Sequence, residues 1–255
     1  MKFSIKAYAI SEQGKYRSNQ EDTIFPSEGK TSDSDRLFIL CDGMGGHEKG
    51  EVASAAVCEA MSKYILSASK PEGEFSDDII ASAVEYALDV LDKLDDGSVK
   101  KMGTTMVLLK LHEGGATIAH IGDSRCYQIR PSKNGADATQ IMFKTRDHSL
   151  VNDLIRLGEM TEEEARVSKQ KNVITRAMMP HLDRRPKADI AHITDIQPDD
   201  YFYLCSDGML DQMNDTNLKF IFSKSDASDL DKVNMLKGSS LESSDNHSAH
   251  IIHIL

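Results

Sequence analysis

The chain contains no uninterrupted apolar stretch of about 18 residues, the length that a membrane-spanning helix requires. Its first segment, residues 1–15, alternates apolar and polar side chains and lacks the continuous apolar core of a signal peptide. Internal repeats and long low-complexity linkers are also missing. We therefore expect a cytoplasmic protein whose residues 1–255 form a single domain without a membrane anchor.

Cysteine is scarce, and its pattern excludes several kinds of site. The four cysteines (Cys41, Cys58, Cys126 and Cys205) have no Cys-x-x-Cys spacing, and each lies in an apolar run. Buried free thiols in a reducing compartment are the favoured interpretation, with a disulfide or a zinc site as the remaining alternatives. No Cys-x5-Arg loop is present, which disfavours catalysis by a nucleophilic cysteine.

Basic residues are too few to balance the acidic ones. The chain has 30 Lys and Arg against 41 Asp and Glu, which gives a net charge of −11. This excess disfavours nucleic acid and anionic membranes as partners, because both carry negative charge themselves. The hydrophobic fraction of 40% is ordinary for a globular protein with a large core. Part of the acidity fits carboxylates that bind metal ions.

The periodicity of apolar residues predicts an α+β fold. Two amphipathic helices, Gly50–Ser67 and Asp77–Leu94, follow one another directly, which does not fit a wound βαβ sheet. The expected strands are Phe3–Ala9, Arg36–Cys41, Thr104–Leu111, Ala116–Ile121, Arg125–Arg130, Gln140–Lys144, Asp189–Ile196, Tyr201–Cys205 and Ser248–Leu255. Shorter helices are expected after Ser149, after a capping box of Thr161 and Glu164, at Asn217–Ser223 and at Ser228–Lys237. This order favours antiparallel sheets covered by helices.

Four short segments place an Asp beside Gly, Asn or a second acid: Arg17–Asp22, Asp42–Gly46, Ser206–Gly208 and Ser244–Asn246. Asp42 and Asp207 each follow an apolar strand, and Asp245 comes just before the last strand. Carboxylates at strand ends can converge in a cleft between two sheets. A lone Asp-Gly is usually only a turn, and a lone Arg is usually a surface charge, so the argument depends on the four segments together.

Ligation by oxygen alone suits Mg²⁺ or Mn²⁺ better than zinc, and no His or Cys pair has the spacing of zinc ligands. Two such ions sharing one carboxylate would activate a water molecule and hold a phosphoryl group. Arg17 would add a fixed bidentate donor for phosphate oxygens. The residues therefore predict a single metal centre assembled from distant parts of the chain.

In these segments the chain resembles the metal-dependent serine/threonine protein phosphatases of type 2C, in their compact bacterial form. The resemblance rests on GKYRSNQED, CDGMGGHEKGEVAS, MGTTMVLL, IGDSRCYQIR, TRDHSLV, NVITRAM, LCSDGMLD and SSDN, which occur in this order nearly from end to end. The pattern DGMGGHxxGE is highly specific, whereas DG alone would be weak. The resemblance implies two packed antiparallel sheets that form a central sandwich with helices on the outside.

The resemblance also implies roles for individual residues. Asp42 would bridge two Mn²⁺ or Mg²⁺ ions, and the carbonyl of Gly43 would bind one of them. The other implied ligands are Asp207 and Asp245 directly, Glu21 and Asp22 largely through water, and Asp123 with Asp211 at a third, weaker site. Arg17 would hold the substrate phosphate. The implied reaction is direct attack of a metal-activated water on phosphorus, without a phospho-enzyme.

The chain departs from the family pattern at few positions. Met44 stands where many eukaryotic members have a His that aids proton transfer, so the general acid is unassigned, and a metal-bound water is our first hypothesis. His247 and Ser248 replace an apolar residue and Thr after the last motif; Ser248 keeps the hydroxyl, and His247 is interpreted as a tolerated neighbour. For His47 and His148, roles in packing or hydrogen bonding are as plausible as roles in catalysis.

Leu150–Asp189 is polar and poor in helix, and it matches the variable flap of the family. A stretch of this kind is expected to set substrate access, with simple surface decoration as the alternative. The expected activity is hydrolysis of phosphoserine and phosphothreonine in proteins that a Ser/Thr kinase modifies, by a monomer. A catalytically silent binding module and a small-molecule phosphatase are the alternatives. A calcium-binding structural domain lacks its DxDxDG loop.

Overall fold

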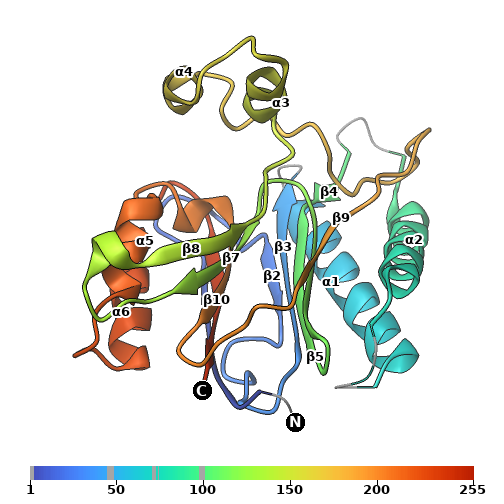
Figure 1. The fold of residues 1–255 in the computed structure, drawn as a ribbon. Coiled ribbons are helices and arrows are strands. Elements are labelled where there is room, and N and C mark those ends of the chain that lie inside the picture. The colour runs from blue at the N-terminus through green and yellow to red at the C-terminus, as the bar shows by residue number, and fades with distance from the viewer. Residues whose placement is uncertain (1–2, 45–48, 71–72, 74, 98–100) are drawn as a thin grey trace.

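Two antiparallel sheets packed face to face form the centre of the molecule (Figure 1). The computed structural model describes residues 3–44, 49–70, 73, 75–97 and 101–255. The first sheet has the strand order β1 (Ile5–Glu12), β11 (His247–Ile254), β10 (Tyr201–Cys205), β7 (Arg125–Arg130) and β8 (Gln140–Lys144). The second has the order β2 (Asp22–Phe25), β3 (Leu37–Met44), β5 (Met106–His112), β6 (Gly115–Ile121) and β9 (Asp189–Ile193), and the short β4 (Gly103–Thr104) pairs with the end of β3.

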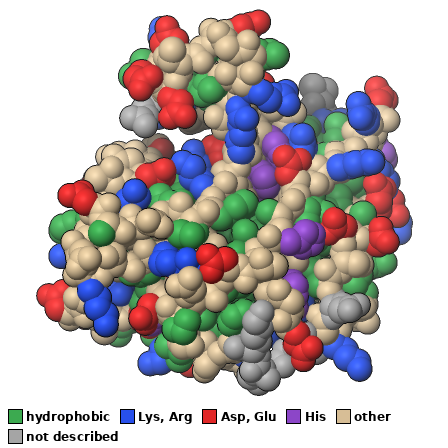
Figure 2. All heavy atoms as spheres, viewed as in Figure 1, with side chains coloured by type: hydrophobic (Ala, Val, Ile, Leu, Met, Phe, Trp, Pro, Cys, Tyr) green, Lys and Arg blue, Asp and Glu red, His purple; other side chains and the backbone are tan. Residues whose placement is uncertain are grey.

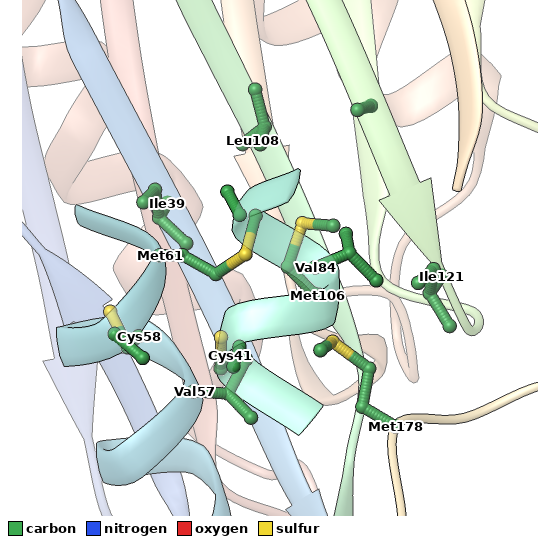
Figure 3. Packing of buried hydrophobic residues seen from close by; sticks show 14 of the residues in the cluster. Ile39, Cys41, Val57, Cys58, Met61, Val84, Met106, Leu108, Ile121 and Met178 are labelled. Carbon is green, nitrogen blue, oxygen red and sulfur yellow. The ribbon is translucent and has the colours of Figure 1, made fainter. Parts of the chain in front are cut away.

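Helices cover the outer face of each sheet, so the body has four layers. The long helices α1 (Lys49–Ala68) and α2 (Asp77–Leu94) lie on the second sheet, and α5 (Asp215–Phe222) and α6 (Asp229–Ser240) lie on the first (Figure 1). Figure 3 shows the layer under α1 and α2, where Met61 of α1 and Met106 of β5 belong to one buried cluster. The predicted sandwich with helices outside is confirmed.

Burial on both faces explains why the central strands are continuous apolar runs. Along β10, Tyr201, Tyr203 and Cys205 pack toward α5 and α6, while Phe202 and Leu204 pack between the two sheets. Successive side chains of a strand point to opposite faces, so a strand covered on both sides needs apolar residues at every position. The four cysteines are buried and free, as predicted.

Most predicted elements are confirmed, and several, including α2, β7, β8 and β10, have the predicted bounds. The sequence interpretation missed β2 and β4. Strand β2 has only four residues at the edge of its sheet and begins with an acid, so it lacks a readable apolar pattern. Helix α5 begins at Asp215, earlier than predicted, because Asn214 caps it through a capping box with Asn217.

The segment Leu150–Asp189 contains a small lobe that stands apart from the sandwich (Figures 1 and 2). It holds α3 (Leu150–Leu157) and α4 (Glu162–Val167), capped by Ser149 and by the predicted Thr161–Glu164 capping box. Within α3 only Val151 is buried. We call this lobe, residues 150–175, the flap. Among the described residues, no helix is both long and apolar enough to cross a membrane.

Candidate metal centre

The predicted acids meet at one end of the sandwich, although they come from distant parts of the chain. Asp22 begins β2 and lies opposite Asp42 in the register of β2 with β3. In the first sheet, Asp207 follows β10, and Asp245 precedes the neighbouring strand β11. The two sheets therefore bring one pair of acids each to the same end.

Burial and mutual repulsion raise the pKa values of these carboxyl groups, which places their charges close to one another. Burial, followed by the charges of Asp207 and Asp245, raises the pKa of Asp22 to about 7. Burial and the neighbouring charges of Asp22 and Asp207 raise the pKa of Asp42 well above its ordinary value. Burial and the charge of Asp245 likewise raise the pKa of Asp207 to about 6. A cluster of this kind binds protons when nothing else neutralises it, and a divalent cation would neutralise it better.

Two carboxylate oxygens at this end have no partner among the described residues. Oδ1 of Asp22 and Oδ1 of Asp207 are both buried and accept no hydrogen bond. Buried acceptors are normally satisfied, and an unpaired carboxylate oxygen is especially costly. Oxygens held in this way match the ligands that Mg²⁺ and Mn²⁺ prefer, so the residues present fit the metal that the sequence predicts.

Both glycines of the two Asp-Gly pairs are required by close backbone contacts. A Cβ on Gly43 would lie 2.2 Å from the carbonyl oxygen of Gly50, and a Cβ on Gly208 would lie 2.0 Å from the carbonyl oxygen of Asn246. Neither position has room for any other residue. The glycines therefore allow separate chain segments to approach the acids, which a simple turn would not need.

Hydrogen bonds from neighbouring strands fix the backbone of Asp42. Its N–H donates to Oγ1 of Thr105 at 3.0 Å, and its carbonyl accepts from the Thr105 N–H and from Oγ1 of Thr104, both at 2.9 Å. Oγ1 of Thr105 also lies 2.7 Å from Oγ of Ser124. The GTT and GDS motifs of the sequence thus meet behind Asp42.

Arg17 lies at the rim of the centre. Its guanidinium donates to Oδ2 of Asp245 at 2.5 Å and lies 3.7 Å from Oε2 of Glu21. The side chain is 43% exposed, so it can contact both an acid of the centre and a ligand that arrives from solvent.

The two acids predicted to form a third site both lie near Asp207. Asp123 is buried in the turn between β6 and β7, where burial and the charge of Asp207 raise its pKa to about 7. Asp211 also acts electrostatically on Asp207. Its Oδ2 accepts hydrogen bonds from Oγ of Ser243 at 3.0 Å and from the N–H of Ser244 at 3.3 Å.

The comparison with protein families adds the decisive observation. Residues 17–237 match the family model described as protein phosphatase 2C. The chain belongs to the protein phosphatase 2C family. Protein phosphatase PhpP of Streptococcus pneumoniae is 31% identical over 214 residues, which cover 83% of this chain and 82% of that protein.

Solved structures of serine/threonine phosphatases share the whole fold. The serine/threonine phosphatase Stp1 from Staphylococcus aureus superimposes with a TM-score of 0.83 and 29% identity, covering 100% of this chain and 98% of that chain. The catalytic domain of the serine/threonine protein phosphatase PstP, solved in complex with two manganese ions, has a TM-score of 0.75 and 26% identity, covering 99% of each chain.

The sequence interpretation did not identify the role of Asn246, which bonds the loop before β2 to the segment before β11. Asn246 is buried, and its Oδ1 accepts from the N–H of Glu21 at 2.9 Å. Its Nδ2 donates to the carbonyls of Gln13 and Asn19, both at 2.8 Å. Asn246 therefore holds the loop that carries Arg17. The SSDN motif gave the position, but nothing local in the sequence indicates partners so far away.

Two serines also support the centre. Oγ of Ser206 donates to Oδ2 of Asp22 at 2.9 Å and accepts from the N–H of Ser248 at 3.0 Å. The backbone N–H of Ser248 thus supports the Ser206 hydroxyl that contacts Asp22, whereas the Ser248 hydroxyl itself has no hydrogen-bond partner among the described residues.

The histidines singled out from the sequence occupy other positions. Nδ1 of His247 lies 3.2 Å from the carbonyl oxygen of Asp245, a contact that holds a turn. His47 falls outside the described residues, as do the two glycines of the DGMGG motif at positions 45 and 46. Met44 is partly buried at the end of β3.

Another group of metal-ligating residue types has unsuitable chemistry for a metal. Possible ligand atoms of His120, His148 and Asp189 lie within 4.8 Å of one another. The N–H of Gly122 donates to Nδ1 of His148 at 3.0 Å, so in the neutral ring the proton is on Nε2. A protonated Nε2 cannot ligate a metal. The rings of His120 and His148 are also stacked, with an interplanar angle of 5°, so their in-plane lone pairs do not converge.

Proposed function

We propose that this member of the protein phosphatase 2C family hydrolyses phosphoserine and phosphothreonine in proteins, at a centre that holds two Mn²⁺ or Mg²⁺ ions. The observation that carries the proposal is the cluster formed by Asp22, Asp42, Asp207 and Asp245, whose mutual repulsion and unpaired buried oxygens call for a divalent cation. The PstP catalytic domain, which has the same fold, contains two manganese ions.

The proposed ligands follow the position of each acid. Asp42 lies between Asp22 of its own sheet and Asp207 of the other sheet, so it is the residue suited to bridge two ions. Asp207 and Asp245 would complete the shell on one side and the carbonyl of Gly43 on the other. Glu21 and Asp22 would act largely through water.

When bound, the ions would supply an activated water as nucleophile and would neutralise charge on the phosphoryl oxygens. The chain itself orients the reactants. Arg17 would hold the substrate phosphate through its forked N–H groups, and its present partner, Asp245, keeps it at the rim of the centre. Thr105 and Asn246 would hold Asp42 and the Arg17 loop in place, so that little reorganisation accompanies the reaction.

A weaker third ion would be held by Asp123 and Asp211. Support for this site comes from the crowding of acids: burial and repulsion from Asp207 raise the pKa of Asp123 to about 7. The flap would set access for protein substrates. These substrates would come from a Ser/Thr kinase, and the phosphatase would act as a monomer.

The proposal is tested with Asp207→Asn, which keeps the shape of the side chain and removes its charge. Turnover of a phosphothreonine peptide with Mn²⁺ should fall by about 100-fold or more, because a charged ligand is lost. Asp137→Asn serves as the control, since Asp137 is an exposed acid between β7 and β8. Wild-type turnover in Asp207→Asn would refute the ligand set, and a preference for sugar phosphates would refute the substrate class.

A further inference from the structure

The flap joins the sandwich through a narrow pair of chain segments, residues 148–150 and 173–175, which we call the flap neck. The N–H of Leu150 donates to the carbonyl of Val173, and the N–H of Thr175 donates to the carbonyl of His148, both at 2.8 Å. Ser149 lies opposite Ile174 in an isolated antiparallel bridge. Any displacement of the flap therefore passes through His148 and its neighbours.

The same His148 is bonded twice to the turn that carries Asp123. Its backbone N–H donates to the carbonyl of Gly122 at 2.9 Å, and its ring Nδ1 accepts from the N–H of Gly122 at 3.0 Å. The ring is buried, and His120 stacks on it with the ring centroids 4.6 Å apart. Nε2 of His120 lies 2.8 Å from the carbonyl oxygen of Arg146, two residues before His148. The ring of His148 is thus held at its Nδ1 edge by Gly122 and on one face by His120.

The far edge of the ring faces the strand that follows the flap. Nε2 of His148 lies 3.1 Å from Oδ2 of Asp189, the first residue of β9, although the ring does not point straight at this oxygen. Arg176 donates to the other carboxylate oxygen of Asp189 at 2.5 Å. Burial lowers the pKa of His148, which favours the neutral ring that this arrangement needs.

The Gly122 turn is itself packed tightly behind the metal centre. Gly122 has φ +109°, and a Cβ on it would lie 2.6 Å from Cγ2 of Thr105. Ser124, two residues later, is hydrogen-bonded to Oγ1 of Thr105, which accepts from the N–H of Asp42. A shift of this turn would therefore displace the side chain of Thr105, which positions the backbone of Asp42.

We propose that His148 is a positioning residue that holds the Gly122–Asp123 turn at its Nδ1 edge and the start of β9 at its Nε2 edge, and so links the flap neck to the metal centre. The proposal rests on the proposed phosphatase activity for its kinetic consequences. Its structural content, a neutral ring with the proton on Nε2, stands independently of that activity.

Two substitutions test the contact of Nδ1 with Gly122 and the contact of Nε2 with Asp189 separately. Asparagine places an amide oxygen near the position of Nδ1, so His148→Asn keeps an acceptor for Gly122 and loses the contact with Asp189. Glutamine places its amide nitrogen near the position of Nε2, so His148→Gln keeps a donor toward Asp189 and loses the acceptor for Gly122. A residue that only filled space would respond alike to both changes.

The measurements are Mn²⁺ affinity by calorimetry and steady-state kinetics with p-nitrophenyl phosphate and with a phosphothreonine peptide. His148→Gln should weaken Mn²⁺ binding and lower kcat for both substrates, each by about 10-fold, the usual effect of losing a group that orients metal ligands. His148→Asn should keep Mn²⁺ affinity and the p-nitrophenyl phosphate kinetics and should raise KM for the peptide several-fold, because it loses only the contact with Asp189 that holds the start of the strand after the flap.

The matched control is His192→Asn. His192 lies on the same strand, β9, and is also paired with an acid, Asp77, at 2.9 Å, but neither Asp77 nor Thr117, its two side-chain partners among the described residues, belongs to the metal centre. It should match the wild type in every assay. Equal effects of His148→Asn and His148→Gln, or wild-type behaviour of both, would overturn the proposal. Inactivity of the wild type toward the peptide would instead refute the proposed function.

A measurement on the metal-free wild type decides the structural part without any variant. Long-range ¹H–¹⁵N correlation spectra should show His148 with Nδ1 unprotonated and Nε2 protonated, and hydrogen exchange should show the amides of Leu150 and Thr175 protected. A proton on Nδ1 would contradict the proposal, because Gly122 would then have no acceptor.

Discussion

The metal centre is held together by contacts between distant segments, whereas the contacts of the flap join residues much closer in sequence, 3 residues apart at its caps and 22 apart between Thr175 and Asp153. Asn246 and Glu21 are bonded across 225 residues of sequence, and Ser206 and Asp22 across 184. The flap depends on helix caps such as Thr161 with Glu164, three residues apart. The centre therefore exists only when the whole sandwich has folded, while the flap joins the sandwich at its neck.

The metal centre is also much more deeply buried than the flap. The residues that support the centre are nearly inaccessible, with Thr105 at 0% and Asn246 at 2% exposure. The flap leaves apolar side chains in solvent, with Leu157 at 65% and Val167 at 84%. Figure 2 shows this lobe carrying hydrophobic and charged side chains next to one another. The side chains that support the acids are thus enclosed by the sandwich, whereas the flap is largely open to solvent.

Two glycines give the sharpest test of this comparison. Gly208→Ala should destabilise the fold by at least about 3 kcal/mol and abolish Mn²⁺ binding, because the new Cβ would overlap the carbonyl of Asn246. Gly158→Ala, at the end of α3 in the flap, should cost only about 1 kcal/mol, because φ is +75° but no atom lies within 4 Å. Urea unfolding of both variants measures the difference, and similar losses would contradict the comparison.

A buried histidine in the sandwich should make stability depend on pH. His250 is fully buried against Phe38, and burial lowers its pKa to about 4, whereas the unfolded chain has the ordinary value of 6.5. Below pH 6.5 the unfolded state binds a proton that the folded state refuses, so the contribution of His250 to the free energy of unfolding should fall by about 3 kcal/mol between pH 6.5 and pH 4.

The check is urea unfolding of the wild type and of His250→Leu across this pH range. From pH 6.5 to pH 4, His250→Leu should lose about 3 kcal/mol less of its free energy of unfolding than the wild type, because leucine has no proton to bind. The same pH dependence in both proteins would show that the pKa of His250 does not differ between the folded and unfolded states. The flap should contribute nothing to this difference in pH dependence between the wild type and His250→Leu.

Asn246 gives the next largest effect. Asn246→Ala should lower the free energy of unfolding by about 2 kcal/mol, because the buried N–H of Glu21 and the partly buried carbonyls of Gln13 and Asn19 lose their partner. It should also weaken phosphopeptide binding through the loop that carries Arg17. Thr161→Ala, which removes a cap in the flap, should cost about 1 kcal/mol or less. A larger loss in Thr161→Ala than in Asn246→Ala would reverse the comparison.

The sequence predicted most of the fold because its patterns are local. The run Tyr201–Cys205 indicates a strand buried on both faces, and the structure covers it with helices on one side and a sheet on the other. Thr161 and Glu164 predict a helix start from three residues. Strand β2 was missed because its short edge position leaves no pattern, and its pairing with β3 is what brings Asp22 to Asp42.

The acids themselves could be found from their setting at strand ends, but their supports could not. Asn246, Thr105 and Ser206 lie in motifs that carry the family resemblance, but they act through partners in other segments that their local sequence does not identify. The same holds for His148, whose role depends on a turn 26 residues away. Long-range hydrogen bonds become visible only when the sheets bring the segments together.

The most direct test of the central claim is anomalous diffraction from crystals grown with Mn²⁺. We expect two strong manganese peaks, each about 2.1 Å from carboxylate oxygens. Asp42 should contact both ions, and Asp207 and Asp245 should contact one of them. Peaks confined to His120, His148 and Asp189, or no bound manganese at all, would contradict this claim.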